Sequence, residues 1–215
     1  MRGMRVPDWV QDTRISYDTV AVSYADMLRD ALAGEPFQRG ILGLFAEVLR
    51  ARPAGPVADV GCGPGRISGY LREQGLDVFG IDLSPGMVEV ARREHPGIRF
   101  DEGSMTALDV ADGSLAGVLA WFSLIHVPDD EVPGVLAEFR RVLRPGGALL
   151  VGFHAGDGSK LKSEGYGGHP MNVYVHRRPA QRVSGWLREA GFTVEAELLH
   201  RPEPNVEGAF VFANR

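Results

Sequence analysis

Two acidic residues and a group of glycines are the first features of this sequence that could do chemistry. Asp59 lies in the apolar run Val57–Val60, the turn GCGPG follows at residues 61–65, and Asp82 comes at the end of the next apolar run. Glycines let the backbone approach a ligand, and a carboxylate about 20 residues further on can bind both hydroxyls of a ribose. The spacing therefore favours an adenosine-like ligand, although tight packing alone would also explain such a turn.

Around these residues, short apolar runs alternate with helical patterns, as in a parallel sheet whose two faces are covered by helices. Strands are expected at residues 56–60, 77–81, 98–102, 115–122, 148–153, 192–199 and 209–213. Helices are expected at residues 13–33, 37–50, 65–74, 85–94, 131–143 and 179–190. The pattern predicts an α/β fold with seven strands, whose carboxyl ends carry the ligand site.

Residues 154–179 break this alternation, because they are rich in glycine and show little periodicity. An unstructured connection longer than about 15 residues in a compact domain is usually functional or disordered. The segment contains three histidines and two tyrosines, which favours a function. We therefore predict a substrate lid at residues 155–178, inside a single domain of residues 1–215 that begins with a helical cap at residues 1–50.

Composition excludes several classes of protein. The 215 residues are 44% hydrophobic and 24% charged with a net charge of −5, which is typical of a globular domain and unlike a protein that grips nucleic acid through a basic surface. No apolar run is long enough to span a membrane. Cys62 is the single cysteine, which indicates a reducing compartment. We expect a cytoplasmic protein with a small-molecule partner, without nucleic acid or membrane, and make no prediction about oligomeric state.

Five motifs in order resemble those of the class I S-adenosylmethionine-dependent methyltransferases. They are VADVGCGPG, FGIDLSPGMVEVAR, RFDEGSMTALD, LAWFSLIHVPDD and LRPGG, and together they span much of the chain. The resemblance implies a Rossmann-like, doubly wound seven-stranded sheet of order 3-2-1-4-5-7-6, with strand 7 antiparallel and helices on both faces. It also implies S-adenosyl-L-methionine as cofactor and an enzyme that transfers the methyl group in line to a nucleophilic atom of a small-molecule acceptor.

The resemblance also implies which residues surround the cofactor. Asp59 would orient the methionine amino group, Asp82 would hold the ribose, and Leu83 and Met87 would sandwich the adenine. Side chains of the first helix would cap the methionine carboxylate, although ordinary helix packing would account for them nearly as well. The full set that the resemblance implies is Arg14, Tyr17, Tyr24, Asp59, Gly61, Cys62, Gly63, Asp82, Leu83, Met87, Ser104, Met105 and Trp121.

Candidate catalytic residues are histidines near the carboxyl ends of the fourth and fifth strands. His126 is the first choice for a general base because imidazole titrates near neutral pH, although it could simply pack beneath the site. His154 and His169 in the predicted lid are further candidates. A metal set that adds Asp157 and His176 matches no known ligand spacing, so no metal is predicted. Cys62 is expected to be a small filler, since no base that could activate it is identifiable nearby in the sequence.

Two other functions remain open from the residues alone. A nicotinamide-dependent oxidoreductase would use a similar turn, but Arg66 stands where the dinucleotide fingerprint requires a third small residue. A non-catalytic protein that binds S-adenosylmethionine for regulation would keep the same pocket. A nucleic-acid methyltransferase is disfavoured by the acidic balance and by the absence of an N/D-P-P-Y-type motif after the fourth strand.

Overall fold

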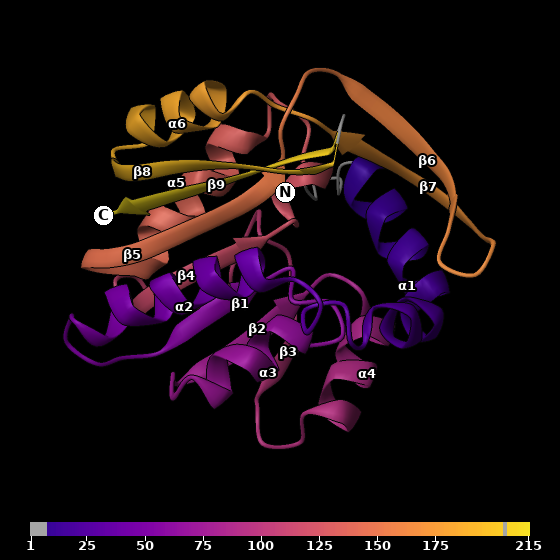
Figure 1. Cartoon of the computed structure of the whole chain (residues 1–215), viewed down its shortest axis with the longest axis horizontal. Helices are drawn as coiled ribbons and strands as arrows, with labels where there is room; N and C mark the ends of the chain where they lie inside the picture. Colours follow the sequence, from indigo (N-terminus) through magenta and orange to yellow (C-terminus); the bar gives the residue numbers. More distant parts are fainter. Residues whose placement is uncertain (1–7, 204–205) are drawn as a thin grey trace, which may run out of the picture.

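A computed structural model describes residues 8–203 and 206–215, in which helices and strands alternate through most of the chain (Figure 1). The first seven residues of the predicted helical cap lie outside the described residues. The α-helices are α1 (Asp8–Leu28), α2 (Pro36–Arg50), α3 (Arg66–Glu73), α4 (Pro85–Glu94), α5 (Val132–Val142) and α6 (Ala180–Glu189), with a short 3₁₀ helix η1 (Leu124–His126). The strands are β1 (Val57–Val60), β2 (Val78–Asp82), β3 (Phe100–Glu102), β4 (Leu115–Trp121), β5 (Leu143–His154), β6 (Ser159–Gly165), β7 (His169–His176), β8 (Thr193–Glu203) and β9 (Val206–Asn214).

The main sheet has seven strands in the order β3-β2-β1-β4-β5-β9-β8. Strands β1 to β5 are parallel to one another, whereas β9 runs antiparallel to both β5 and β8. Since β8 and β9 are the sixth and seventh strands of this sheet in chain order, the predicted order and the antiparallel seventh strand are confirmed.

Helices cover both faces of the sheet, which explains the continuous apolar runs in its central strands. One face packs against α5 and α6 through a cluster that includes Val118, Phe139 and Leu187. The other packs against α2 and α3 around Phe45 and Leu71. All seven residues of β4 are buried, as expected for a central strand with helices on both sides.

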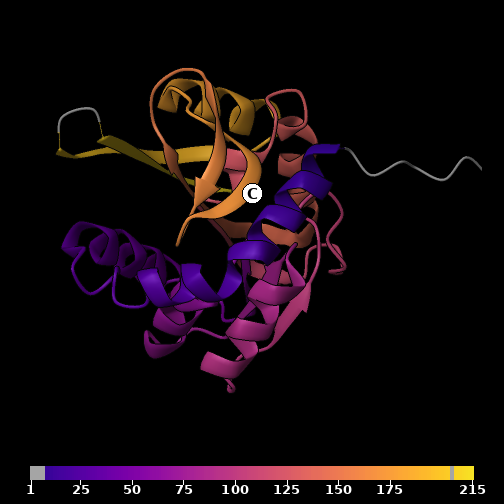
Figure 2. The ribbon, with the colours of Figure 1, turned by 90° about the vertical axis from the view of Figure 1, so that its right-hand side faces the viewer.

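The predicted irregular segment after β5 is instead a hairpin, so that part of the sequence prediction was wrong. Strands β6 and β7 pair antiparallel and lie across α1, as two views of the ribbon show (Figures 1 and 2). Met171 and Val173 of β7 are buried against Val20 and Ala21 of α1. Only alternate residues of β7 are buried, and the outer strand β6 is polar and exposed, so its sequence carries little apolar signal.

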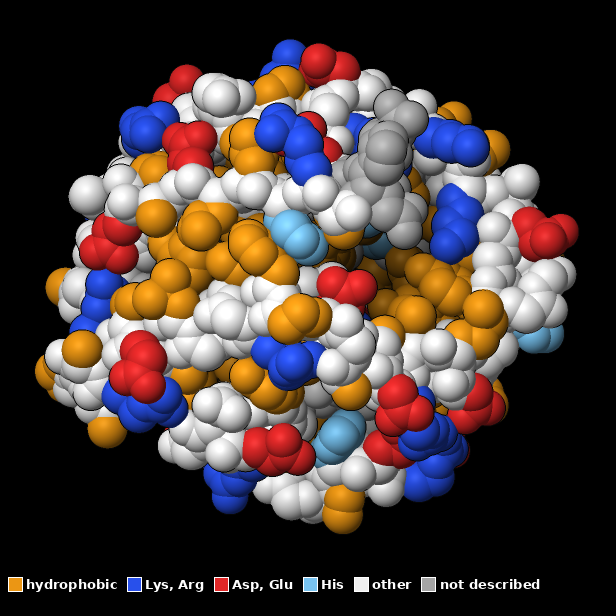
Figure 3. Space-filling model, in the orientation of Figure 1, with side chains coloured by type: hydrophobic (Ala, Val, Ile, Leu, Met, Phe, Trp, Pro, Cys, Tyr) orange, Lys and Arg blue, Asp and Glu red, His pale blue; other side chains and the backbone are white. Residues whose placement is uncertain are grey.

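Helix α1 and the hairpin together form a cover over the carboxyl ends of the parallel strands. The predicted helix began at residue 13 and ended at residue 33, whereas α1 occupies Asp8–Leu28 and packs on α4. Asp18 ties the two helices together, because its Oδ1 accepts hydrogen bonds from the Ser84 hydroxyl at 3.0 Å and the Gly86 amide at 2.7 Å. In the orientation of Figure 1, the space-filling view has a hollow near the centre of the molecule, and apolar side chains gather beside it (Figure 3).

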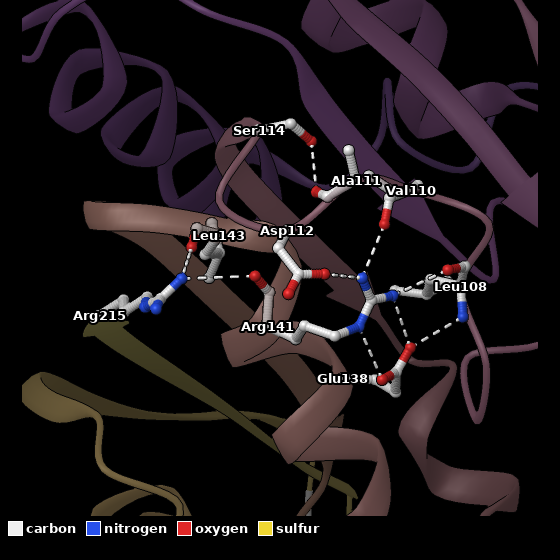
Figure 4. A network of polar contacts seen from close by, with 9 residues as sticks. All are labelled: Leu108, Val110, Ala111, Asp112, Ser114, Glu138, Arg141, Leu143 and Arg215. Atoms are coloured by element: carbon white, nitrogen blue, oxygen red, sulfur yellow. Dashed lines mark hydrogen bonds and ion pairs between the residues drawn. The ribbon is translucent and has the colours of Figure 1, made fainter.

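A polar network closes the opposite edge of the sheet (Figure 4). The Arg141 guanidinium of α5 donates hydrogen bonds to the Leu108 and Val110 carbonyls, both at 2.8 Å, and to Glu138 and Asp112. Glu138 in turn accepts a bond from the Leu108 amide at 3.0 Å. The network fixes the loop that leads into β4 against the last turn of α5.

Candidate active site

A two-lobed cavity lies where the cover meets the carboxyl ends of the parallel strands. The smaller lobe has a cavity volume of about 100 Å³ and is lined by Leu83, Met87, Ser104 and Met105. The larger lobe has a cavity volume of about 360 Å³ and reaches Asp59, Arg66, His154 and Tyr166. The two lobes share a wall made of Tyr17, Tyr24, Gly61, Gly63, Trp121 and Phe122. A ligand that spans both lobes would therefore touch most of the residues predicted from the sequence.

Asp82 lies at the end of β2 and faces the smaller lobe. Its carboxylate accepts hydrogen bonds from the backbone amides of Gly63 at 2.7 Å and Ser84 at 2.9 Å. Burial raises its pKa, while these backbone bonds act in the opposite direction by stabilising the charged form. The remaining lone pairs of the carboxylate are available to accept bonds from a ligand hydroxyl.

The three glycines of the turn have left-handed backbones for different reasons. At Gly61 a Cβ would lie 2.3 Å from the Ser123 Cβ, and at Gly65 it would lie 2.7 Å from the Phe100 ring, so both glycines are required by packing. At Gly63 the nearest atoms, on Met87 and Tyr24, are 4.0 Å away. Gly63 is therefore the turn residue at which bare backbone faces open space in the cavity.

Asp59 is buried in β1 with one carboxylate oxygen unpaired. Its Oδ2 accepts a hydrogen bond from the Ser68 hydroxyl at 2.6 Å, whereas its Oδ1 has no partner within the described residues. Burial raises the pKa of this carboxyl group to about 7, partly offset by the bond from Ser68. An unpaired buried carboxylate oxygen is costly for the fold and points to a ligand donor that would pair with it.

His126 and Tyr17 form a hydrogen-bonded pair at the wall of the cavity. His126 Nδ1 lies 2.8 Å from the Tyr174 carbonyl of β7, which can only accept, so Nδ1 carries the proton and Nε2 is bare. The Tyr17 hydroxyl, 2.7 Å from Nε2, is therefore the donor in that bond. Burial lowers the pKa of His126 to about 4 and raises that of Tyr17, so both groups are neutral at pH 7.

The other candidate histidines lie in different surroundings. His154 ends β5 with its ring 5.0 Å from that of Phe122, lines the larger lobe, and has its pKa lowered by burial and by the charges of Arg177 and Lys162. His169 is exposed at the start of β7 and lines neither lobe. The structure thus brings His126 and His154 to the cavity but leaves His169 outside it.

Two members of the predicted cofactor set differ from their expected setting. Arg14 lies exposed on α1, with its guanidinium 3.9 Å from the Glu102 carboxylate, and lines neither lobe. Cys62 borders the larger lobe, but its side chain is buried against Phe100 and Val88, and burial raises the pKa of its thiol well above the ordinary value. A thiol in that state is a poor nucleophile, in agreement with the filler role expected of it.

Sequence reasoning missed several residues that shape the site. Phe122, which the sequence did not single out, and Tyr166, one of the two tyrosines of the predicted lid, are the two non-glycine residues with left-handed backbone in the described part of the chain, and both line the larger lobe. Such strain is concentrated at functional sites. Arg178 is buried and donates to the Leu124 and Val127 carbonyls, which fixes the turn that carries His126. No local pattern distinguished Phe122 or indicated that Arg178 is buried, because their partners come from distant segments.

The structure also bears on the membrane and metal predictions. Across residues 8–203 and 206–215, no helix has the length and apolarity needed to cross a bilayer. The same residues contain no group of three or more histidine, cysteine or acidic side chains placed to hold a metal ion. In particular, the histidines and Asp157 that had been considered as a metal set do not form such a group.

Comparison with known proteins agrees with the motifs. Residues 57–147 match the model of a methyltransferase domain. A demethylmenaquinone methyltransferase from Renibacterium salmoninarum is 38% identical over 63% of this chain and 55% of its own length. A malonyl-[acyl-carrier protein] O-methyltransferase from Serratia marcescens is 34% identical over 63% of this chain and 52% of its own. The chain thus spans about half the length of these curated relatives.

Solved structures share the whole fold at lower identity. A 1,6-didemethyltoxoflavin-N1-methyltransferase from Burkholderia thailandensis has a TM-score of 0.72 at 24% identity, covering 100% of this chain and 92% of that one. A magnesium protoporphyrin IX methyltransferase from Synechocystis has a TM-score of 0.71 at 18% identity, covering 98% of both chains. A [4+2]-cyclase has the same fold with a TM-score of 0.71, so the fold alone does not fix the reaction. The five motifs, the family match over residues 57–147 and the order of the sheet together make the chain similar to the class I S-adenosylmethionine-dependent methyltransferases.

Proposed function

We propose that this protein transfers a methyl group from S-adenosylmethionine to a nucleophilic atom of a small-molecule acceptor. The observation that carries the proposal is the cavity itself, in which Asp82, the open backbone of Gly63 and the unpaired oxygen of Asp59 lie along one continuous wall. Asp82 would bind the ribose of the cofactor, the backbone of Gly63 would contact its methionine portion, and Asp59 would pair with its amino group. The family match supports the same assignment.

The residues present fit this cofactor. Leu83, Met87 and Met105 supply an apolar slot for the adenine, next to Asp82 for the ribose hydroxyls. Asp59, with one oxygen unsatisfied, suits the methionine ammonium group. When bound, the cofactor supplies a methyl group already activated on a sulfonium, so the protein needs mainly to position the acceptor.

Positioning by the shared wall is the main catalytic contribution that we propose for the chain. Trp121 and Phe122 lie edge to face, with ring centroids 5.6 Å apart, at the boundary between the lobes. The left-handed backbone of Phe122 and the packing of both rings on Phe210 fix these two surfaces at the boundary. Holding the acceptor in line in a near-attack arrangement is worth roughly 7 kcal/mol or more of barrier lowering, and a strong base is then unnecessary.

If the acceptor must lose a proton, we propose His154 as the side chain that receives it directly. Its ring faces the larger lobe and makes no hydrogen bond within the described residues, and its lowered pKa keeps it neutral at pH 7. His126 has its one basic nitrogen occupied by Tyr17. We therefore assign His126 to orient the Tyr17 hydroxyl, which leaves the Tyr17 oxygen free to accept a bond in the cavity.

The hairpin of β6 and β7 keeps the predicted role of a lid in this proposal. Tyr166, in the turn between its strands, stacks edge to face on Tyr24 at 4.5 Å and reaches the larger lobe. An acceptor bound there would be enclosed by aromatic rings from the hairpin, α1 and the end of β4. A small molecule suits this enclosure, and the single cysteine makes the cytoplasm our proposed location.

Calorimetry with the demethylated product tests the proposal. We expect S-adenosylhomocysteine to bind with micromolar or tighter affinity and NAD to show no heat of binding. Binding of NAD without binding of S-adenosylhomocysteine would contradict the proposal and favour the alternative of a nicotinamide-dependent oxidoreductase. Incubation with radiolabelled S-adenosylmethionine and a panel of small acceptors then separates an enzyme from a non-catalytic binding protein, because only the enzyme moves label to an acceptor.

A further inference from the structure

Arg66 is an unpaired cation at the larger lobe. It is the first residue of α3, directly after the glycine turn, and its side chain is half-buried. Within the described residues its guanidinium makes no hydrogen bond or ion pair, whereas many of the other arginines are paired with a carboxylate or a carbonyl. An arginine at a cavity wall with no partner in the protein is available to pair with an anionic group of a ligand.

The charges along the cavity identify where an anion can bind. Among the described residues that line the two lobes, Arg66 is the one lysine or arginine, and the carboxylates there are Glu35, Asp59 and Asp82. Arg14, which the sequence suggested as a carboxylate ligand, is on the exposed face of α1 near Glu102. A negatively charged ligand group in this cavity therefore has one full positive charge to pair with.

Asp59 supplies the second, independent observation. Its unpaired Oδ1 is buried at the end of the same lobe, and the positive charge of Arg66 acts on the Asp59 carboxyl and on the Tyr24 hydroxyl. The same lobe is thus lined by an unpaired carboxylate oxygen and by an unpaired guanidinium that is close enough to act on it electrostatically. A group with an ammonium and a carboxylate on one carbon, an α-amino acid, complements both charges.

We infer that Arg66 binds the carboxylate of the cofactor's amino-acid end while Asp59 pairs with its ammonium group. The inference rests on the proposed function. The planar guanidinium suits two parallel bonds to a carboxylate, and Arg66 lies at the N-terminus of α3, where the helix dipole favours negative charge. Arg66 is then a cofactor-positioning residue, which fixes one end of the cofactor while Asp82 fixes the sugar.

Calorimetry with two ligands tests the inference. S-adenosylhomocysteine carries the amino-acid group, and 5′-methylthioadenosine keeps the adenosine and the sulfur but lacks it. We expect Arg66→Gln to weaken S-adenosylhomocysteine binding about 10- to 100-fold, the range for hydrogen bonds to charged groups. The same substitution should change methylthioadenosine binding less than about twofold, and Arg66→Lys should recover part of the loss because it keeps the charge without the planar fork.

Arg72→Gln is the matched control, because Arg72 lies on the same helix, is exposed and lines neither lobe. It should leave both affinities unchanged, and circular dichroism should show that each variant is folded. Equal weakening of both ligands by Arg66→Gln, or no weakening of either, overturns the inference alone. If the unaltered protein binds neither ligand, the proposed function fails, and the inference fails with it.

Discussion

The two edges of the main sheet treat their polar groups in opposite ways. At the edge where β4 and β5 begin, the Arg141 guanidinium is bonded to Leu108, Val110, Glu138 and Asp112, so its donors are paired within the protein (Figure 4). At the edge where the parallel strands end, polar groups are left incomplete. The difference shows that polar groups stabilise the fold where β4 and β5 begin, whereas those at the ends of the parallel strands remain available to bind a ligand.

The incomplete groups are concentrated around the cavity. Three buried side-chain atoms lack a hydrogen-bond partner within the described residues, and two of them, Asp59 Oδ1 and Trp9 Nε1, belong to residues that line it. The third, Ser184 Oγ, is in α6. Substitutions at the edge that carries the cavity should therefore mainly change ligand binding, whereas substitutions at the opposite edge should mainly change stability, because each buried group left unpaired costs roughly 1–3 kcal/mol.

The largest effect is expected from Asp82→Ala at the open edge. The variant loses the acceptor for the ribose and for the Gly63 and Ser84 amides, so S-adenosylhomocysteine binding should weaken at least 100-fold, or about 3 kcal/mol. Calorimetry measures the loss. Asp112→Ala at the closed edge is the control and should bind normally; equal affinities for the two variants would contradict the comparison.

Arg141→Met at the closed edge should lower stability without touching binding. The substitution keeps the apolar stem but leaves the Leu108 and Val110 carbonyls and Glu138 without their donor, which should reduce the free energy of unfolding by about 2 kcal/mol. Urea unfolding measures the change. Affinity for S-adenosylhomocysteine should stay within twofold, and a larger loss of affinity would show that the two edges are coupled.

Asp59→Asn should stabilise the ligand-free protein at pH 8 and weaken the binding of S-adenosylhomocysteine. Because burial raises the pKa of Asp59 to about 7, above its unfolded value, the ionised carboxylate costs stability increasingly as pH rises toward and through 7. Removing the charge should therefore increase the free energy of unfolding by roughly 1–2 kcal/mol at pH 8. Denaturant curves at pH 5 and pH 8 test this, and a gain of equal size at both values would argue against the charge as its cause.

The smallest predicted effect is the pH dependence of binding. Protonated Asp59 cannot pair with an ammonium group, so affinity for S-adenosylhomocysteine should fall as pH drops through 7, by at most about tenfold per pH unit. Asp82 raises the pKa of Asp59, whereas Ser68 and Arg66 lower it, so these groups set the midpoint. Calorimetry from pH 6 to pH 8 measures the slope, which Asp59→Asn should flatten; an unchanged slope would exclude Asp59 as its source.

Much of the sheet was predictable because burial on both faces leaves a local signature. The predicted helix at residues 85–94 coincides with α4, whose start is fixed by Ser84 as N-cap, with its hydroxyl accepting from the Met87 amide, and by Pro85 at the first helical position. The strands that contain Asp59 and Asp82 were predicted correctly because strands buried on both faces have continuous apolar sequences. The hairpin was missed because its outer strand is exposed, and alternation over a few residues is a weak signal.

The sequence by itself determined the order of helices and strands, the bare turn after β1, and the carboxylate at the end of β2, since each depends on neighbours within a few residues. Only the tertiary structure decided how those groups are used. Packing against Ser123, rather than a ligand, requires glycine at position 61. His126 meets Tyr17 and the Tyr174 carbonyl only when three distant segments come together, and only that assembly leaves Arg66 unpaired beside the cavity.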